Sequence, residues 1–488
     1  MEKLRVPDEL KMSKLLENYP ADDIAGFHKD KVYFICDSIY RGMQKLGEDM
    51  VHPDKKDQYF VPLHSEILRK VFGGNCYKGI LLWMECAGII IPDGKWEAKR
   101  VSQGYKFVDY FLDCHTTWIT VTCSTLLSKE VRNYIEKKLH FQPAVAKRLE
   151  KWFDKDRLQI DAPKAHELND ALEAAEKAST HNEKKIRQAH ITAIANQNKI
   201  DNIVSGNYLF EQDEFGYRLH TVISQLPKEF RSLISYDGMP MVEIDLSCSQ
   251  LFFSTFLLDY RHWKFKNSKP FHKELWNKVS IIDNKNNNNL NTIMYINSLE
   301  SSYGKGFQQH TFFKTSCEGL IYDTVVAKLD EQNFFAENFD FAQKRKRVKK
   351  VLLQQLFANQ FDKEHGGLFC NKNRPILEAF TALYPEVVYI YSQIKEGHYK
   401  DLCKLLQRIE SIAMQHFVCK RLQADHPNVP IFTLHDCIVT TQGNEQLVRQ
   451  VMEDGIRQYV GYVPEMKIKP WSSFEVKLNE ALPMQQAA

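Results

Sequence analysis

The sequence has no segment that marks a secreted or membrane protein. Residues 1–14 contain no apolar core of signal-peptide length. The longest apolar stretch, residues 79–92, contains Glu85 and is too short to span a bilayer. We therefore expect a cytoplasmic protein with no membrane partner.

Paired cysteines are also absent. None of the eleven cysteines forms a CxxC pair or another metal-like spacing, and Cys86, Cys248 and Cys419 lie in apolar runs. This pattern indicates buried free thiols in a reducing compartment rather than disulfides or a structural zinc site.

The chain also lacks a strong excess of charge. A formal net charge of +3 gives no indication of nucleic acid, while 43% hydrophobic and 26% charged residues exclude disorder and a fibrous class. The run 344–350 places six cations in seven residues, which suits either a solvated helix face or a phosphate-binding surface. Because 488 residues exceed what one core usually organises, we expect two or more domains.

Residues 58–110 have the order of a small winged-helix-like module. Such a module either contacts DNA or serves only for packing, and its nearly all-apolar second helix suits burial better than a DNA groove. Both roles stay open from the sequence. The expected elements are helices at 64–72 and 77–86, a strand at 89–91, a turn at 92–94 and a strand that ends at 104–107.

The chain divides into three expected regions and shows no internal repeat. Residues 1–125 hold the N-terminal module. Residues 126–204 are rich in Lys, Glu, Ala and Gln, which predicts long solvated helices in a linker or a separate lobe. Residues 205–488 form the third region, in which the Asn-rich tract 284–289 is predicted to be a solvent loop.

Two acidic residues lie where expected strands end. Apolar and acidic residues alternate over 241–245, so a strand delivers Asp245 at its end, and residues 430–441 are typical of a hairpin with Asp436 in its turn. Two carboxylates on adjacent strand ends can hold two Mg²⁺ ions about 4 Å apart. Glu243 shares a strand face with Asp245, and we expect it to form a salt bridge or a core hydrogen bond.

A basic segment lies between these carboxylates in the sequence. Arg345, Lys349, Leu353 and Phe357 follow one another at four-residue steps, which places them on one face of a helix. Two cations followed by an aromatic ring suit a nucleoside triphosphate whose base stacks on the ring. The alternative is an amphipathic helix with a basic end, which the two carboxylate motifs make less favourable.

The order of these motifs resembles the family A DNA polymerases (the DNA polymerase I type) and the related single-subunit phage and mitochondrial RNA polymerases. Residues 245–251 resemble motif A of that family, residues 345–357 resemble the motif B helix, and His435 with Asp436 resembles motif C. The similarity extends over about residues 205–475.

The resemblance implies an α+β fold of the right-hand polymerase type, in which a palm with an antiparallel sheet carries helical fingers and a thumb. Residues 205–488 would form the palm and fingers, and residues 126–204 a thumb-like lobe. Residues 406–411 resemble the family's glutamine helix and would open a helix. A helix at 445–459, a strand near 466–468 and Trp471 resemble its C-terminal part.

The resemblance also implies roles for single residues. Asp245 and Asp436 would be catalytic and bind two Mg²⁺ ions, with the carbonyl oxygen of Leu246 as a further ligand, and Lys349 would protonate the leaving pyrophosphate. The nucleotide-binding residues would be Arg345, Lys349, Phe357 and Gln250, and the residues that face the primer-template would be Arg218, Gln407 and His435.

The positions that select the sugar depart from the family pattern. Gln250 stands where the DNA polymerases carry a Glu that excludes a ribose 2′-hydroxyl, and Phe357 stands where the family usually has Tyr; both favour deoxynucleotides. Cys248, between two serines, and Cys437 are closer to the RNA polymerases. Nothing before Asp245 resembles the acidic cluster of a proofreading exonuclease, so we expect none.

We therefore expect a primer-extending DNA polymerase of a phage, plasmid or mobile element, acting in a bacterial or virus-infected host cell. Its partners would be a DNA primer-template, nucleoside triphosphates and a replication or mobile-element protein. One alternative is a single-subunit DNA-directed RNA polymerase whose N-terminal module reads a promoter. Another is a non-catalytic nucleic-acid-binding protein that keeps the palm as a scaffold.

Overall fold

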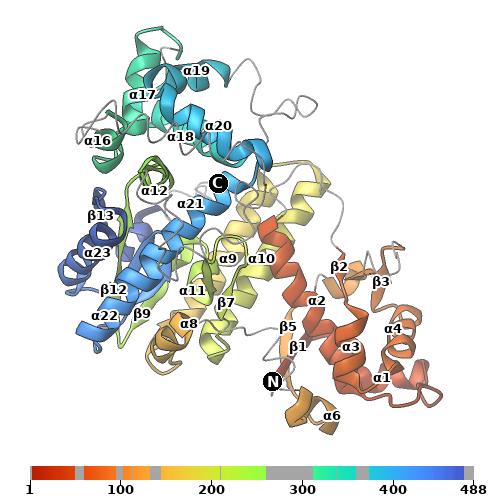
Figure 1. The fold of residues 1–488 in the computed structure, drawn as a ribbon. Helices are drawn as coiled ribbons and strands as arrows, with labels where there is room; N and C mark the ends of the chain where they lie inside the picture. Colours follow the sequence, from red (N-terminus) through yellow and green to blue (C-terminus); the bar gives the residue numbers. More distant parts are fainter. Residues whose placement is uncertain are drawn as a thin grey trace, which may run out of the picture.

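The segments that carry Asp245 and Asp436 belong to one antiparallel sheet in the computed structural model (Figure 1). The strand order is β11-β12-β10-β9-β6, and β13 pairs with β10. The predicted strand and the predicted hairpin are both confirmed. The strands are β6 (Leu158–Ile160), β9 (Ile234–Tyr236), β10 (Met239–Leu246), β11 (Phe432–Leu434), β12 (Cys437–Thr441) and β13 (Met466–Pro470).

The structure describes most of the chain. The Asn-rich tract and much of the segment 130–139, one of the expected solvated helices, lie outside the described residues. The described ranges are 3–49, 60–94, 103–112, 114–131, 144–208, 210–259, 311–336, 338–358 and 373–477.

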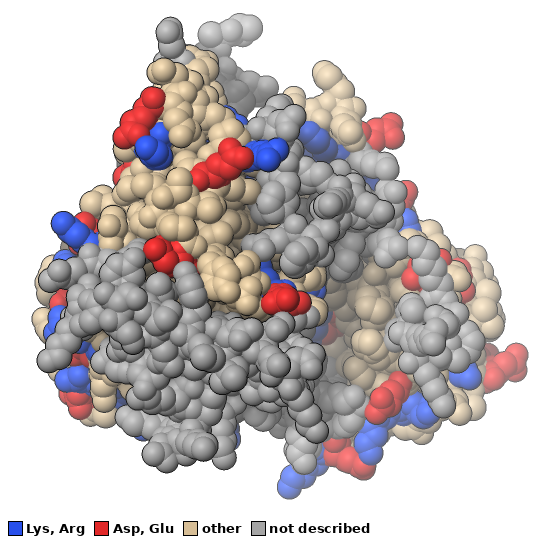
Figure 2. All heavy atoms as spheres, turned by 45° about the horizontal axis from the view of Figure 1, so that its top comes forward, with Lys and Arg blue, Asp and Glu red and all other residues tan. Residues whose placement is uncertain are grey.

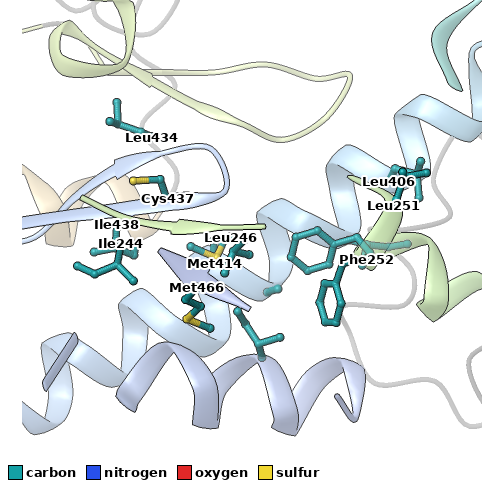
Figure 3. Close-up of a cluster of buried hydrophobic side chains, with 14 of the residues drawn as sticks. Ile244, Leu246, Leu251, Phe252, Leu406, Met414, Leu434, Cys437, Ile438 and Met466 are labelled. Atoms are coloured by element: carbon teal, nitrogen blue, oxygen red, sulfur yellow. The ribbon is translucent and has the colours of Figure 1, made fainter. Parts of the chain in front are cut away.

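The two faces of β10 have different surroundings. Ile244 lies opposite Ile438 of β12 and Ile468 of β13, and Leu246 lies opposite Met466. Figure 3 shows Ile244, Ile438, Leu246 and Met466 in one buried cluster. Because side chains alternate along a strand, Glu243 and Asp245 project from the other face.

Helices from both ends of this region pack around the sheet. The apolar helix α12 (Ser249–Leu258) follows β10 directly and packs against α21 and α23. The prediction that residues 406–411 open a helix is wrong, because that helix begins five residues earlier. The helices are α21 (Asp401–Ile412), which continues through the π-helical segment η7 (Ala413–Cys419) into α22 (Lys420–Asp425), and α23 (Glu445–Val460).

A second group of helices lies at the top of Figure 1 and joins the first through α12, α18 and α21. Its α18 is the predicted basic helix. Asp340 begins it with a capping box, in which its carboxylate accepts from the main-chain N–H of Gln343 at 2.7 Å. The helices are α16 (Thr311–Cys317), α17 (Ile321–Asp330), α18 (Phe341–Phe357), α19 (Arg374–Leu383) and α20 (Pro385–Gly397).

The N-terminal region has its own hydrophobic core (Figure 1, lower right). Helix α3 ends at Gly73, whose φ of +75° is the left-handed conformation that glycine adopts readily. The expected helices and hairpin strands are confirmed to within one residue. The order is β1 (Lys3–Pro7), α1 (Met12–Asn18), α2 (Lys29–Asp49), β2 (Val61–Pro62), α3 (Ser65–Phe72), α4 (Cys76–Cys86), β3 (Ile90–Pro92), β4 (Gly104–Phe107), α5 (Asp109–Leu112), β5 (Thr116–Thr120) and α6 (Ser124–Leu127), with sheets β2-β4-β3 and β1-β5.

One long helix contributes to both cores. Ile191 and Ile194 of α10 belong to the N-terminal core, whereas Ile200 and Ile203 belong to the larger core. Residues 126–204 are therefore less solvated than expected, and they also contain β6, a strand that the sequence analysis did not assign. The remaining elements between the N-terminal region and β9 are α8 (Ala144–Leu149), η2 (Glu150–Trp152), α9 (Ala162–Ala178), α10 (Glu183–Ser205), β7 (Phe210–Gln212), β8 (Leu219–Thr221), α11 (Val222–Gln225) and η3 (Lys228–Leu233). Strands β7 and β8 form a separate two-stranded sheet, and η8 (Trp471–Lys477) follows β13.

The thiols and the surface agree in part with the expectations. The ten cysteines in the described part of the chain are free, but Cys86 is exposed rather than buried. Within the described ranges, no helix combines the length and the apolar character needed to cross a membrane. On the face shown in Figure 2, acidic and basic side chains are interspersed, in keeping with the nearly balanced charge.

Candidate active site

The register of the central sheet brings the two predicted carboxylates together. Asp245 of β10 lies opposite Cys437 of β12, and Asp436 is the residue before Cys437, in the turn that joins β11 to β12. The chain thus places two carboxylates next to each other although 190 residues separate them. The prediction that two strand ends would meet at this point agrees with the observed pairing.

The surroundings of Asp436 disfavour its anionic form. Burial raises its pKa, the charge of Asp245 raises it further, and a hydrogen bond from the Ser249 hydroxyl opposes both effects. A bound cation would remove the repulsion between the two carboxylates, and carboxylate oxygens are the donors that Mg²⁺ prefers. The described residues contain no group of three or more His, Cys, Asp or Glu side chains able to hold a metal ion, so substrate phosphates and water would have to complete the coordination.

Asp245 differs from Asp436 because a protein cation already contacts it. The ammonium of Lys469, on β13, donates to Oδ2 of Asp245 and lies 3.5 Å from Oε1 of Glu243. Burial would lower the pKa of Lys469, but the hydrogen bond to Asp245 and the nearby carboxylate charges outweigh burial and raise it. Leu246, the next residue along β10, buries its side chain in the core, so only its main chain is left for a metal ligand.

Glu243 forms the salt bridge and core hydrogen bond that the sequence analysis expected. Its Oε2 accepts from Trp471 Nε1 at 3.0 Å and from Arg231 NH1 at 3.3 Å. The side chain is 7% exposed, and three donors surround it. Glu243 therefore links β10 to β13 and to η8 through hydrogen bonds and ion pairs of its side chain.

A buried charge network lies beside the carboxylates. Arg218 donates from Nε (2.9 Å) and NH2 (2.7 Å) to Oε1 of Glu410, and Nε2 of Gln250 donates to Oε2 of the same carboxylate. Burial raises the pKa of Glu410 to about 7; the charge of Arg218 opposes this and that of Asp436 adds to it. Two predicted residues, Arg218 and Gln250, thus meet at a carboxylate that the sequence analysis missed.

The segment around Arg218 is fixed against α21. Arg408 of α21 donates to the carbonyl oxygens of Phe215 (2.9 Å) and Glu214 (3.2 Å). Gln407 packs so closely on Gly216 that a side chain there would collide with it. The segment that carries Arg218 and the helix that resembles the family's glutamine helix are therefore neighbours.

His435 lies in the turn next to Asp436 with a φ of +56°. Its ring centroid is 5.7 Å from that of His220. Burial lowers the pKa of His435 to about 4, and the charges of Arg218 and His220 add to this effect, so the ring is neutral at pH 7. Within the described residues its Nδ1 is buried without a hydrogen-bond partner.

The basic helix α18 reaches the same corner of the sheet. Arg345 NH2 and Cys248 Sγ both contact the carbonyl oxygen of Gly319, at 3.5 and 3.3 Å. Burial raises the pKa of Cys248 to about 11, and the positive charges of Arg345 and Lys349 oppose this rise. Arg345 also forms an ion pair with Asp323 at 2.9 Å, which a phosphate would have to replace.

Lys349 and Phe357 lie further along this helix. Both side chains are exposed, and Phe357 is the last residue of α18. Helix α18 therefore exposes a cation and an aromatic ring at two of the positions predicted to bind a nucleotide, and that role stays a prediction.

Two residues at this site were not predicted. Glu410 is a carboxylate on the buried face of α21, between Ile409 and Ala413 in the core. A charged residue at an otherwise apolar helix position could have indicated a buried functional or paired carboxylate from the sequence. Lys469 alternates with apolar residues along β13, but the sequence does not reveal which strand it faces.

No protein-family model matches the chain, and no curated protein matches it either. Among solved structures, the chain is similar to the POL domain of Pol1 from M. smegmatis, in a complex with DNA primer-template and dNTP. The similarity has a TM-score of 0.39 and 11% sequence identity, over 72% of this chain and 74% of that chain.

Proposed function

We propose that the chain is a template-directed nucleotidyltransferase, a DNA polymerase that extends a primer. The observation that carries this proposal is the pairing of β10 with β12, which sets Asp245 beside Asp436. Arg345 of α18 reaches the same corner, where its NH2 and the thiol of Cys248 both contact the carbonyl oxygen of Gly319. The charge of Lys349 also acts on Cys248. Adjacent carboxylates next to a cluster of cations suit a reaction that joins a hydroxyl to a nucleoside triphosphate.

Asp245 and Asp436 would hold the two Mg²⁺ ions, with the carbonyl oxygen of Leu246 as a further ligand. When bound, the ions lower the pKa of the attacking hydroxyl and neutralise the charge of the leaving pyrophosphate. The Ser249 hydroxyl orients Asp436 through its hydrogen bond.

The cations of α18 would bind the nucleotide. Arg345 exchanges its ion pair with Asp323 for the triphosphate, and Lys349 contacts the phosphates and protonates the leaving pyrophosphate. Phe357 stacks on the base and Gln250 lies at the sugar. Arg218, Gln407 and His435 face the primer-template.

We also propose a DNA contact for the N-terminal region. Its order is helix, strand, two helices and two strands, with the sheet order β2-β4-β3, which suits a winged helix. The apolar sequence of α4 suggested a buried helix, but Lys78 and Leu82 lie on an exposed side of it. A DNA-contacting module joined to a polymerase core suits a phage, plasmid or mobile element and a replication partner protein.

The test is primer extension by the full-length chain on a DNA primer-template with Mg²⁺ and dNTPs. We expect Asp245→Asn and Asp436→Asn each to reduce the rate by about a thousandfold or more, since the lost stabilisation is about 4 kcal/mol or more. Asp425→Asn is a matched control, because its side chain is 54% exposed at the end of α22. Parental activity in Asp436→Asn would overturn the proposal and favour a non-catalytic nucleic-acid-binding protein.

One observation favours a second candidate, a single-subunit DNA-directed RNA polymerase. Glu410 holds the amide nitrogen of Gln250, whereas Oε1 of Gln250 is buried and has no hydrogen-bond partner among the described residues. An oriented acceptor suits a ribose 2′-hydroxyl, which is a hydrogen-bond donor. Extension with NTPs in place of dNTPs decides between the two, and selective incorporation of ribonucleotides would favour the second candidate.

A further inference from the structure

We infer that Lys469 is a built-in counter-ion of Asp245, which competes with the divalent ion and makes its binding depend on the nucleotide. This inference rests on the proposed function, because it takes Asp245 as a metal ligand. It assigns a role to a residue that none of the polymerase-like motifs contains.

The position of Lys469 follows from the register of β13. Lys469 lies opposite Glu243, and Asp245 is the next residue on the same face of β10. Its ammonium is in direct contact with Oδ2 of Asp245 and only 3.5 Å from Glu243. Since Lys469 and Asp245 are 35% and 30% exposed, an ion from solvent can reach this contact.

If Lys469 had a purely structural role, its main partner would be the buried carboxylate of Glu243. That carboxylate already accepts hydrogen bonds from two other side chains. Arg231 and Trp471 already donate to Oε2 of Glu243, at 3.3 and 3.0 Å. The closer contact of Lys469 is Asp245, which has no other hydrogen-bond or ion-pair partner in the described part of the chain. The lysine therefore neutralises the residue that faces the reaction.

A cation at Asp245 weakens the attraction of that carboxylate for a second cation. Among the described residues no Lys or Arg forms an ion pair with Asp436, although the charge of Arg218 acts on it, so the two carboxylates are unequal before substrate arrives. With Oδ2 of Asp245 shared, the free protein offers Mg²⁺ fewer strong ligands than the two carboxylates suggest. The phosphate oxygens of a nucleotide add ligands, which makes the complex of ion and nucleotide bind better than the ion alone.

The test measures Mn²⁺ binding to the full-length protein without nucleotide, by the loss of the electron paramagnetic resonance signal of free Mn²⁺. We expect Lys469→Met to lower the Kd by about tenfold, because a partly exposed charge in contact with the ligand is removed. Lys469→Arg keeps the charge and should keep the weak binding. Lys11→Met, a lysine 64% exposed in the N-terminal region, is the control and should change the Kd by less than about threefold.

A second neutral variant, Lys469→Gln, covers the case in which Lys469→Met does not fold, and thermal melting with and without Mn²⁺ gives an independent measurement. Mn²⁺ should raise the Tm of the neutral variants more than that of the parent. One outcome overturns the inference about Lys469 but leaves the proposed function standing. In that outcome Asp245→Asn changes the Kd for Mn²⁺, whereas Lys469→Met and Lys469→Gln leave it the same. Absence of Asp245-dependent Mn²⁺ binding, with or without a dNTP, overturns the proposed function as well.

Discussion

Replacement of Glu410 by Gln should change how the stability of the protein depends on pH. The wild-type carboxyl is fully buried and its pKa is raised from 4.5 to about 7. The folded protein therefore holds a proton that the unfolded chain releases at lower pH. The contribution of Glu410 to the free energy of unfolding is fully present below about pH 4.5 and is lost as the pH rises towards 7, whereas the amide of Glu410→Gln does not ionise.

The separation between 4.5 and about 7, at about 1.4 kcal/mol per pKa unit, corresponds to about 3 kcal/mol. The free energy of unfolding of Glu410→Gln, relative to the wild type, should therefore rise by about 3 kcal/mol between pH 4.5 and pH 8. Urea unfolding followed by tryptophan fluorescence at several pH values measures this difference. The control Glu331→Gln has a side chain 64% exposed and should change stability by less than about 0.5 kcal/mol throughout.

A constant difference between Glu410→Gln and the wild type would refute this reasoning, because Glu410 would then keep its ordinary pKa in the fold. A difference that falls with rising pH would show that the ion pair with Arg218 outweighs the burial of the carboxylate. The same variant also exchanges an acceptor for a donor beside Gln250. The side-chain amide of Gln250 would then rotate and direct its nitrogen, instead of its oxygen, towards the sugar of the nucleotide. The ratio of dNTP to NTP incorporation should therefore change as well.

Three further changes test other parts of the site. Arg345→Ala should raise the KM for the nucleotide by about tenfold or more in steady-state extension, through the loss of a charge-assisted hydrogen bond; an unchanged KM would contradict its role at the triphosphate. Gly319→Ala should lower stability by about 1–3 kcal/mol in urea unfolding, because φ is +69° there and a Cβ would lie 2.7 Å from Cβ of Ser247; parental stability would show that the turn relaxes. Lys395→Met should cost about 1–3 kcal/mol in the same assay, because the buried ammonium donates to two carbonyl oxygens at the end of α18, one of them that of Ala358 at 3.1 Å; a neutral effect would mean that water replaces it.

The sequence predicted the parts of this structure that depend on local patterns. Strand β10, the hairpin around Asp436 and the basic helix α18 follow from alternation, turn residues and helical spacing, all of which act between near neighbours. The meeting of Asp245 with Asp436 was predictable only as a hypothesis, because it depends on pairing between distant strands. The observed register supplies that pairing.

The parts that were missed depend on tertiary contacts or on very short elements. Strand β6 has three residues, too few for a period to appear, and its pairing with β9 stabilises it. Lys469 faces Asp245 only because β13 pairs with β10 in one of several conceivable registers. Glu410 was readable as a charge on an apolar helix face, but its partners come from two other segments of the chain.

The helix α10 has a mechanical consequence. Its 23 residues extend over about 35 Å; Ile191 and Ile194 near its middle pack in the N-terminal core, and Ile200 and Ile203 near its C-terminal end pack in the larger core. Arg5 of β1 donates to the carbonyl oxygen of Asn198 and to the carboxylate of Asp201 in the C-terminal half of this helix, each at 3.5 Å. A displacement of the N-terminal region would therefore act through one helix on the core that supports β10, and removal of that region would expose the apolar side chains of Ile191 and Ile194.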